Sequence, residues 1–143
     1  MSATIKKITG LVLLLLLTGC GHTTSNQPYF DPPSPPQGKA LVYLARTHVI
    51  QGSFYDSIFS INDSAVVGLN ERTYSWVFVS PGQHKIAAGQ NNHPRNVFLN
   101  LQIEEGNEYF VEYTQEHMVE LIRARNTQEG KAMVRGYSYI PVR

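Results

Sequence analysis

The chain has 143 residues, enough for one domain with a hydrophobic core and too few for two. It carries 12 Lys and Arg residues against 11 Asp and Glu residues, so it lacks the basic surface that nucleic-acid binding requires. Its single cysteine excludes an intrachain disulfide framework and a paired-cysteine metal or redox site.

Residues 1–19 have the organisation of an export signal. Lys6 and Lys7 precede an apolar run that is too short to span a bilayer and that ends in Leu-Thr-Gly-Cys at Cys20. This ending resembles the lipobox of bacterial lipoproteins. The resemblance implies cleavage before Cys20, attachment of lipid to its thiol and a membrane anchor. Gly21 in the next position implies transport to the outer membrane, with the domain facing the periplasm.

Residues 20–38 form the predicted tether between this anchor and the domain. Five of the eight prolines lie here, and such a composition favours an extended, semi-rigid chain. At about 3.1 Å per residue, the stretch from Gly21 to Gly38 would reach up to roughly 55 Å. Tyr29 and Phe30 are the two residues of the tether that could dock onto the domain.

Residues 39–143 are predicted to form one all-β domain, a single antiparallel β-sandwich of about seven to eight strands. The run from Ala40 to Ala45 is apolar throughout, which indicates a central strand buried on both faces. Strict alternation marks Thr73–Val79 and Val97–Ile103 as strands with one buried face. The other expected strands are 57–62, 65–69, 109–113, 117–125 and 133–140. Residues 83–88 lead into a polar loop at 89–94, and 127–132 are expected to form only a short helical turn.

Several motifs of this domain are similar to an uncharacterised family of small bacterial lipoproteins with a β-sandwich like that of PEGA modules. These motifs are Gly38–Tyr43, Ile61–Leu69, Val79–Ile86, Glu105–Val111 and Glu129–Met133. In the first hairpin, Asp63-Ser64 stands where the family has glycine, which changes the turn type and not the topology. The resemblance implies a fold and an envelope location, and it implies no activity.

No pattern in the chain indicates catalysis, and we expect neither an enzyme nor a bound metal or cofactor. The histidines lack metal-binding spacing, and no serine lies in a nucleophile elbow. Glu108 and Glu112 would lie on one strand face beside Phe110. We expect them to pair with Arg123 and Arg125 of the neighbouring strand rather than to form a catalytic pair.

Aromatic residues are the candidate binding residues, because 10% of the chain is aromatic and such side chains anchor protein partners. The candidates are Phe54, Tyr55, Phe98, Tyr137 and Tyr139. Phe98 is singled out because it lies on the polar face of its strand. The expected role is non-catalytic binding or scaffolding of an envelope protein. A cell-wall glycan module that uses Gln90, Asn91 and Asn92, or a periplasmic inhibitor of a toxin or lytic enzyme, are the alternatives.

Overall fold

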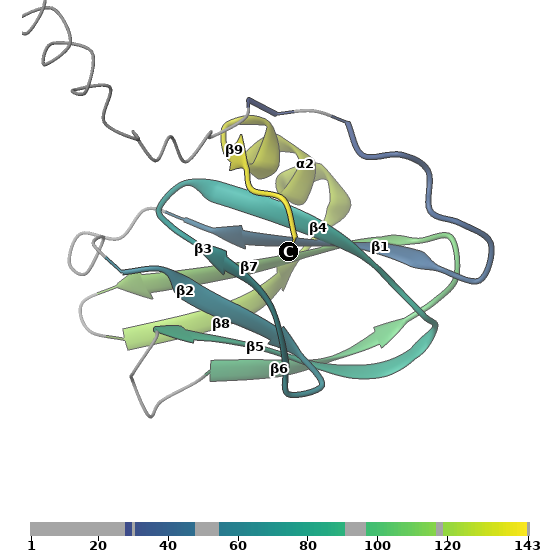
Figure 1. The fold of residues 1–143 in the computed structure, drawn as a ribbon, viewed down its shortest axis with the longest axis horizontal. Coiled ribbons are helices and arrows are strands. Elements are labelled where there is room, and N and C mark those ends of the chain that lie inside the picture. Colours follow the sequence, from purple (N-terminus) through teal and green to yellow (C-terminus); the bar gives the residue numbers. More distant parts are fainter. Residues whose placement is uncertain (1–27, 30, 48–54, 91–96, 117–118, 143) are drawn as a thin grey trace, which may run out of the picture.

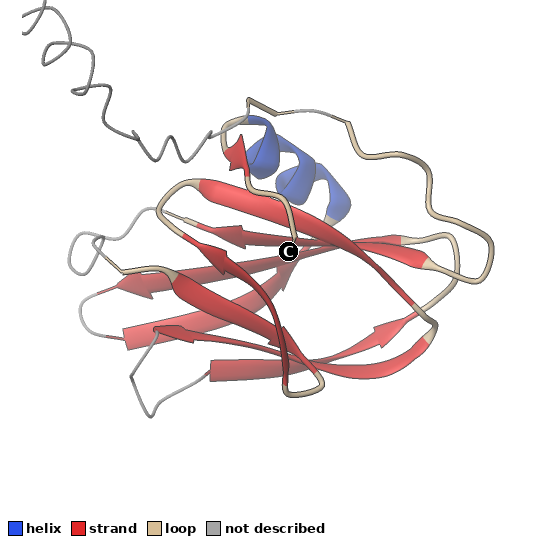
Figure 2. Cartoon of the chain, in the orientation of Figure 1, coloured by secondary structure: helices blue, strands red, loops and turns tan. Residues whose placement is uncertain are grey.

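The computed structural model describes residues 28–29, 31–47, 55–90, 97–116 and 119–142. Nine strands and one helix within these ranges form a two-layered sandwich with the helix on its outside (Figures 1 and 2). The strands are β1 (Ala40–Arg46), β2 (Ser57–Ile61), β3 (Ser64–Leu69), β4 (Thr73–Val79), β5 (Gly82–Gln90), β6 (Val97–Ile103), β7 (Glu108–Glu116), β8 (Val119–Arg125) and β9 (Ser138–Tyr139), and the helix is α2 (Thr127–Arg135). The prediction of an all-β sandwich is therefore confirmed at the level of the class.

One sheet has five strands in the order β8-β7-β1-β4-β9, and the other has four in the order β3-β2-β5-β6. Most neighbours are antiparallel, as expected. However, β1 runs parallel to β7, with Tyr43 opposite Phe110, and β4 runs parallel to β9. The purely antiparallel prediction is wrong for these two pairs, because each joins segments far apart in the chain that no hairpin connects.

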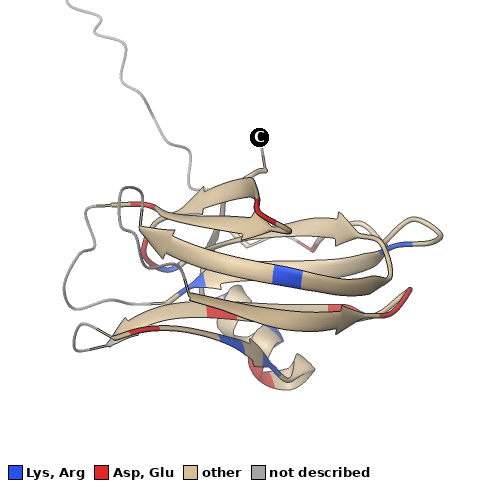
Figure 3. Ribbon diagram, turned by 90° about the horizontal axis from the view of Figure 1, so that it is seen from below, with Lys and Arg blue, Asp and Glu red and all other residues tan. Residues whose placement is uncertain are grey.

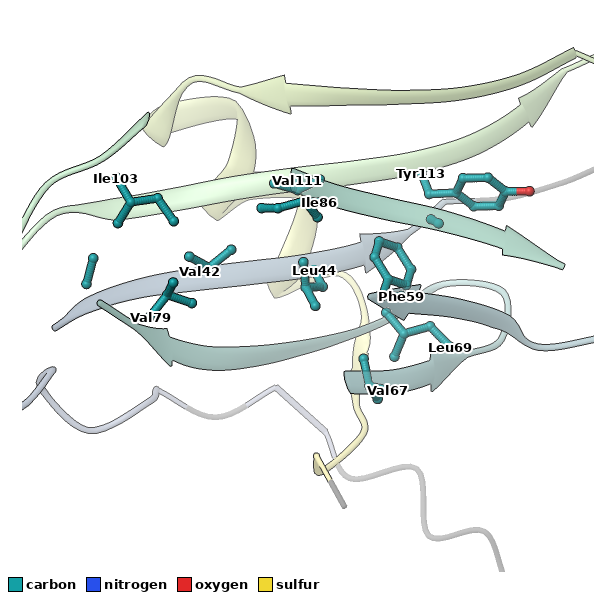
Figure 4. Packing of buried hydrophobic residues seen from close by; sticks show 12 residues of the cluster. Val42, Leu44, Phe59, Val67, Leu69, Val79, Ile86, Ile103, Val111 and Tyr113 are labelled. Atoms are coloured by element: carbon teal, nitrogen blue, oxygen red, sulfur yellow. The ribbon is translucent and has the colours of Figure 1, made fainter. Parts of the chain in front are cut away.

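The main core lies between the two sheets, and β1 contributes to it with alternate residues (Figure 4). Val42 and Leu44 point into the sandwich and meet Phe59 of β2 and Ile86 of β5. Leu41 and Tyr43 point to the opposite face, where they belong to a second core. The prediction that this strand is buried on both faces is thus confirmed.

The second core explains why the outer face of the five-stranded sheet is apolar. It lies under α2 and unites aromatic residues from four strands with Val134 of the helix. Its buried members are Leu41, Tyr43, Ala45, Tyr74, Phe110, Val134 and Tyr139. Figure 1 shows α2 above this sheet, whereas no described helix covers the four-stranded sheet.

Helix α2 replaces the expected short turn and part of the expected strand at 133–140. Asn126 caps its start by accepting a hydrogen bond of 2.9 Å from the Glu129 amide, and Gly136 ends it by donating to Met133. Glu129 in the first turn and Arg135 in the last turn both suit the helix dipole. Only Ser138–Tyr139 remains as a strand, so the sequence prediction missed a helix that is well capped and nine residues long.

One strand, β5, was not predicted from the sequence. It lies in the segment that was expected to lead into a loop. Its second half is apolar and buried, and it pairs with β2 on one side and β6 on the other.

At the far end of β2, Asn62 and Asp63 turn the chain with positive φ angles of 50° and 65°. Two such residues between paired strands make a tight type I′ turn, which agrees with the hairpin expected here without glycine.

Candidate functional site

The candidate site lies at one end of the sandwich, which we call the loop end. Strands β1, β5 and β7 finish there, and β2, β6 and β8 begin there (Figure 1). Loops that extend from one end of a rigid β-scaffold are a common place for binding residues. Residues 48–54, 91–96 and 117–118, which join these strands, lie outside the described ranges.

Exposed apolar side chains gather at the loop end. The structure describes five large hydrophobic residues that are exposed, and four of them occupy the starts of β6 and β8 or the approach to β2. These four are Tyr55 (63% exposed), Phe98 (57%), Val119 (64%) and Leu121 (44%). The fifth residue, Val142, lies next to the carboxyl terminus of the chain. Phe98 lies on the outer face of the four-stranded sheet, whereas Val119 and Leu121 lie on the outer face of the five-stranded sheet. The two exposed aromatic residues, Tyr55 and Phe98, are therefore the candidates for a contact with another molecule.

Phe98 lies on the outer face of the four-stranded sheet, as its place on the polar face of its strand predicted. It stands opposite Ala87 of β5, and the ammonium of Lys85 is 5.3 Å from the centre of its ring. This distance allows a cation–π contact. The neighbours Val97 and Leu99 point the other way and pack on the main core. Phe98 is therefore free to contact a partner while its strand stays fixed by the core.

Two polar links hold the sheets together beneath this surface. Arg46 at the end of β1 is fully buried, and its guanidinium donates to the carbonyl of Leu69 at 3.0 Å and to that of Tyr55. Burial lowers the pKa of Arg46, while Tyr113 and Asp56 raise it. The side-chain amide of Gln90 donates to Gln115 at 3.0 Å and so joins β5 to β7. These contacts fix the approach to β2, and with it Tyr55.

A buried hydroxyl lies next to these links. Tyr113 packs edge-on against Phe59, and its hydroxyl is enclosed near Ser57 and Glu120. Burial first and the charge of Glu120 second raise the pKa of Tyr113 to about 12. Within the described residues, none of these three side chains has its buried oxygen in a well-formed hydrogen bond. Unsatisfied buried oxygens cost free energy and are more frequent near functional sites than elsewhere.

The structure separates the aromatic residues that the sequence grouped together. Tyr55 and Phe98 are exposed at the loop end. Tyr139 is buried between Tyr74 and Trp76, with ring centres 5.6 and 5.9 Å away, and Tyr137 is half-buried against the same second core. Both residues thus support the fold, and Tyr137 alone of the two keeps part of its surface exposed. Phe54 and Cys20, the residue predicted to carry the lipid, lie outside the described ranges.

The acidic residues of β7 serve the fold. The carboxylate of Glu112 is almost fully buried and accepts hydrogen bonds of 2.6 Å from both Arg123 and Arg125, as the sequence predicted. Glu108 pairs instead with Lys131 of α2, at 2.6 Å, because the unexpected helix brings this lysine over the strand. Elsewhere in the described residues, positively and negatively charged residues are interspersed along the strands and the helix (Figure 3).

A second feature is the segment formed by residues 28–29 and 31–38, which we call the strap. It runs along the outside of the five-stranded sheet instead of projecting away from the domain (Figure 1). The ring of Tyr29 stacks on Tyr74 at 5.7 Å, and the amide of Gly38 donates to Glu105 at 2.6 Å. Docking of Tyr29 agrees with the sequence expectation. The predicted tether is then shorter than expected, because only Gly21 to Gln27 separate Cys20 from the strap in the sequence.

We expect Tyr29→Ala to release the start of the strap. The variant removes the stacking on Tyr74, and aromatic pairs are worth about 0.5 to 1.5 kcal/mol beyond buried area. NMR should show shifted ring resonances of Tyr74 and Tyr139 and a small loss of thermal stability. Tyr55→Ala, which removes an exposed tyrosine on the other side of the molecule, is the control and should leave those resonances in place. Unchanged Tyr74 resonances in Tyr29→Ala would contradict a docked strap.

In comparisons with known proteins, no family model matches the chain and no curated protein is similar to it. Within the described ranges, no group of three or more histidine, cysteine or acidic residues is placed to hold a metal ion. The helix in that part of the chain is too short to cross a membrane. The class that the geometry defines is a β-sandwich with one helix-covered sheet, one open sheet and a hydrophobic loop end.

Proposed function

We propose that the chain is an envelope lipoprotein, anchored through Cys20 in the outer membrane and facing the periplasm, that binds another envelope protein without catalysing a reaction. The observation that carries this proposal is the exposure of two aromatic side chains, Tyr55 and Phe98, at the loop end. A central group of aromatic and aliphatic side chains is what protein interfaces use as anchors. The Leu-Thr-Gly-Cys motif that ends at Cys20 supports the lipid anchor, and the export signal in residues 1–19 supports transport out of the cytoplasm.

The buried polar links make this surface suitable for binding. Arg46 and Gln90 connect the two sheets directly below it, so the exposed side chains are held on a rigid base. A preorganised surface loses less conformational freedom when a partner binds. The open outer face of β6, where Phe98 lies, extends the contact area away from the helix-covered side of the domain.

The test is photo-cross-linking in the native cells, with the full lipidated chain carrying the cross-linker at Tyr55 or Phe98. We expect one dominant envelope protein to be captured from both positions. In binding to that partner, Phe98→Ser should weaken the affinity at least tenfold, or more than about 1.4 kcal/mol, because the anchor is lost. Val142→Ser removes a comparably exposed apolar residue away from the loop end and should not change the affinity.

The alternatives predict different outcomes of the same experiment. A glycan module would yield no protein adduct and would sediment with isolated cell-wall sacculi, in which case protein binding is wrong. An inhibitor would capture one toxin or lytic enzyme in equal amounts and stop its activity. Of the residues expected to serve glycan binding, the structure describes only Gln90, and its amide is engaged by Gln115.

A further inference from the structure

A pocket of about 200 Å³ lies between the strap, the five-stranded sheet and α2, on the far side of the molecule from Phe98. Pro32, Pro33 and Pro35 of the strap form one wall. Leu41 and Tyr43 of β1 form the floor, and charged residues of α2 and β7 form the other wall. The pocket is smaller than the roughly 300 to 1,000 Å³ typical of sites for drug-sized ligands, and its volume suits a molecule the size of a single amino acid.

Charged side chains of both signs line this pocket. Lys131 and Glu108 are 2.6 Å apart. The Tyr29 hydroxyl donates to Asp31 at 2.8 Å. Burial and Asp31 raise the pKa of Tyr29, while the guanidinium of Arg135 lies near enough to lower it. The lining therefore offers two carboxylates and two cations, and it favours neither a simple anion nor a simple cation.

The floor adds a hydroxyl that stays protonated. Tyr43 stacks on Phe110 with ring centres 4.4 Å apart, which fixes its orientation. Burial first, and Glu108 second, hold its pKa well above the usual value for tyrosine. Its hydroxyl is thus neutral at every physiological pH and available to a polar ligand group.

We infer that this pocket binds a small zwitterion, namely a free amino acid, which carries both an ammonium and a carboxylate. Arg135 and Lys131 would hold the carboxylate, since arginine recognises it through two parallel hydrogen bonds. Asp31 and Glu108 would hold the ammonium. Because the strap supplies Asp31 and the proline wall, the ligand also stabilises the docked strap. The inference is independent of lipidation and of protein binding at the loop end.

The test is NMR titration of the full mature chain with L-alanine, L-lysine and L-glutamate, each compared with its N-acetyl and C-amide derivatives. At least one free amino acid should shift the backbone amides of Leu41, Tyr43 and residues 131–135. Blocking either charged group should weaken its binding at least tenfold. Arg135→Gln should weaken binding to a similar extent. Lys85→Gln is the matched control, because Lys85 is also paired with a carboxylate at 2.8 Å but lies on the other sheet.

Several results would overturn the inference. Equal binding of blocked and free amino acids would show that the pocket does not recognise the ammonium and the carboxylate of the ligand. No shift up to about 10 mM would exclude a site, because even a ligand with few contacts should bind with a dissociation constant near about 1 mM. A response to N-acetylglucosamine alone would assign the pocket to a sugar. Arg135→Gln and Lys85→Gln should melt at the same temperature as the parent chain. Equal melting temperatures would show that a lost NMR response is not caused by unfolding.

Discussion

Gly130→Ala should destabilise the domain strongly, although alanine is the better helix former. A Cβ atom on Gly130 would lie 2.1 Å from the ring of Phe110, and that ring is stacked on Tyr43 and cannot withdraw. Overpacking of this kind costs about 3 kcal/mol or more, while helix propensity returns at most about 1 kcal/mol. The expected result is a melting temperature lower by roughly 10 °C, measured by circular dichroism.

Gly136→Ala is the matched control for this prediction. It makes the same substitution at the end of the same helix, where the new Cβ would meet its nearest neighbour, a backbone oxygen, at an ordinary 3.5 Å. The φ angle of Gly136 is −89°, which alanine adopts without strain. We expect its melting temperature to stay within about 3 °C of the parent value. Equal stability of the Gly130 and Gly136 variants would contradict the packing of α2 on Phe110.

Glu112→Gln should lower the free energy of unfolding by about 2 kcal/mol at pH 7. The substitution leaves Arg123 and Arg125 facing a neutral side chain in a buried place. The effect stays below that of a fully buried ion pair, because the two arginine side chains are 40% and 29% exposed. Urea unfolding measures the difference. Glu129→Gln, which alters an exposed partner of the same Arg125 at 3.6 Å, should cost less than about 1 kcal/mol.

The same contact makes stability depend on pH. Burial of Glu112 tends to raise its pKa, but the hydrogen bonds and charges of Arg123 and Arg125 outweigh burial and lower it. A lowered pKa in the folded state adds stability above the pKa of the unfolded state, about 4.3, and this contribution is lost as the pH falls below that value. The difference between the parent chain and Glu112→Gln should therefore shrink from pH 5 to pH 3. A difference that stays constant would rule out the ionised pair.

The sequence predicted those parts of the fold that depend on local alternation. Val97–Ile103 and Thr73–Val79 became strands because their periods match a half-buried sheet, and Phe98 is exposed for the same reason. The five-stranded sheet could not be derived, since β1 takes β7 as a parallel neighbour from far along the chain. Helix α2 was missed although Asn126 and Glu129 form a recognisable cap, because its apolar residues are too few to show a period.

The candidate site residues likewise differ in whether a local sequence pattern could predict them. Tyr55 and Phe98 could be named from the sequence, because an exposed aromatic residue is visible as a break in a pattern. Tyr139 has the same local signal and yet lies in the second core, since only the folded chain brings Trp76 and Tyr74 around it. The strap pocket depends entirely on tertiary contacts. Asp31, Glu108 and Arg135 meet there from three separate segments, and no spacing in the sequence relates them.

The position of β1 also determines when the domain can fold. This strand forms near the start of the domain, but its two neighbours are β4 and, last of all, β7, which finishes at Glu116. Contacts between such distant segments give a high contact order and slow folding, because a long loop must close before they form. A chain emerging from its amino terminus therefore leaves β1 without a full set of hydrogen bonds until most of the polypeptide has arrived. Under the export that we propose, this delay would keep the polypeptide unfolded until translocation is nearly complete.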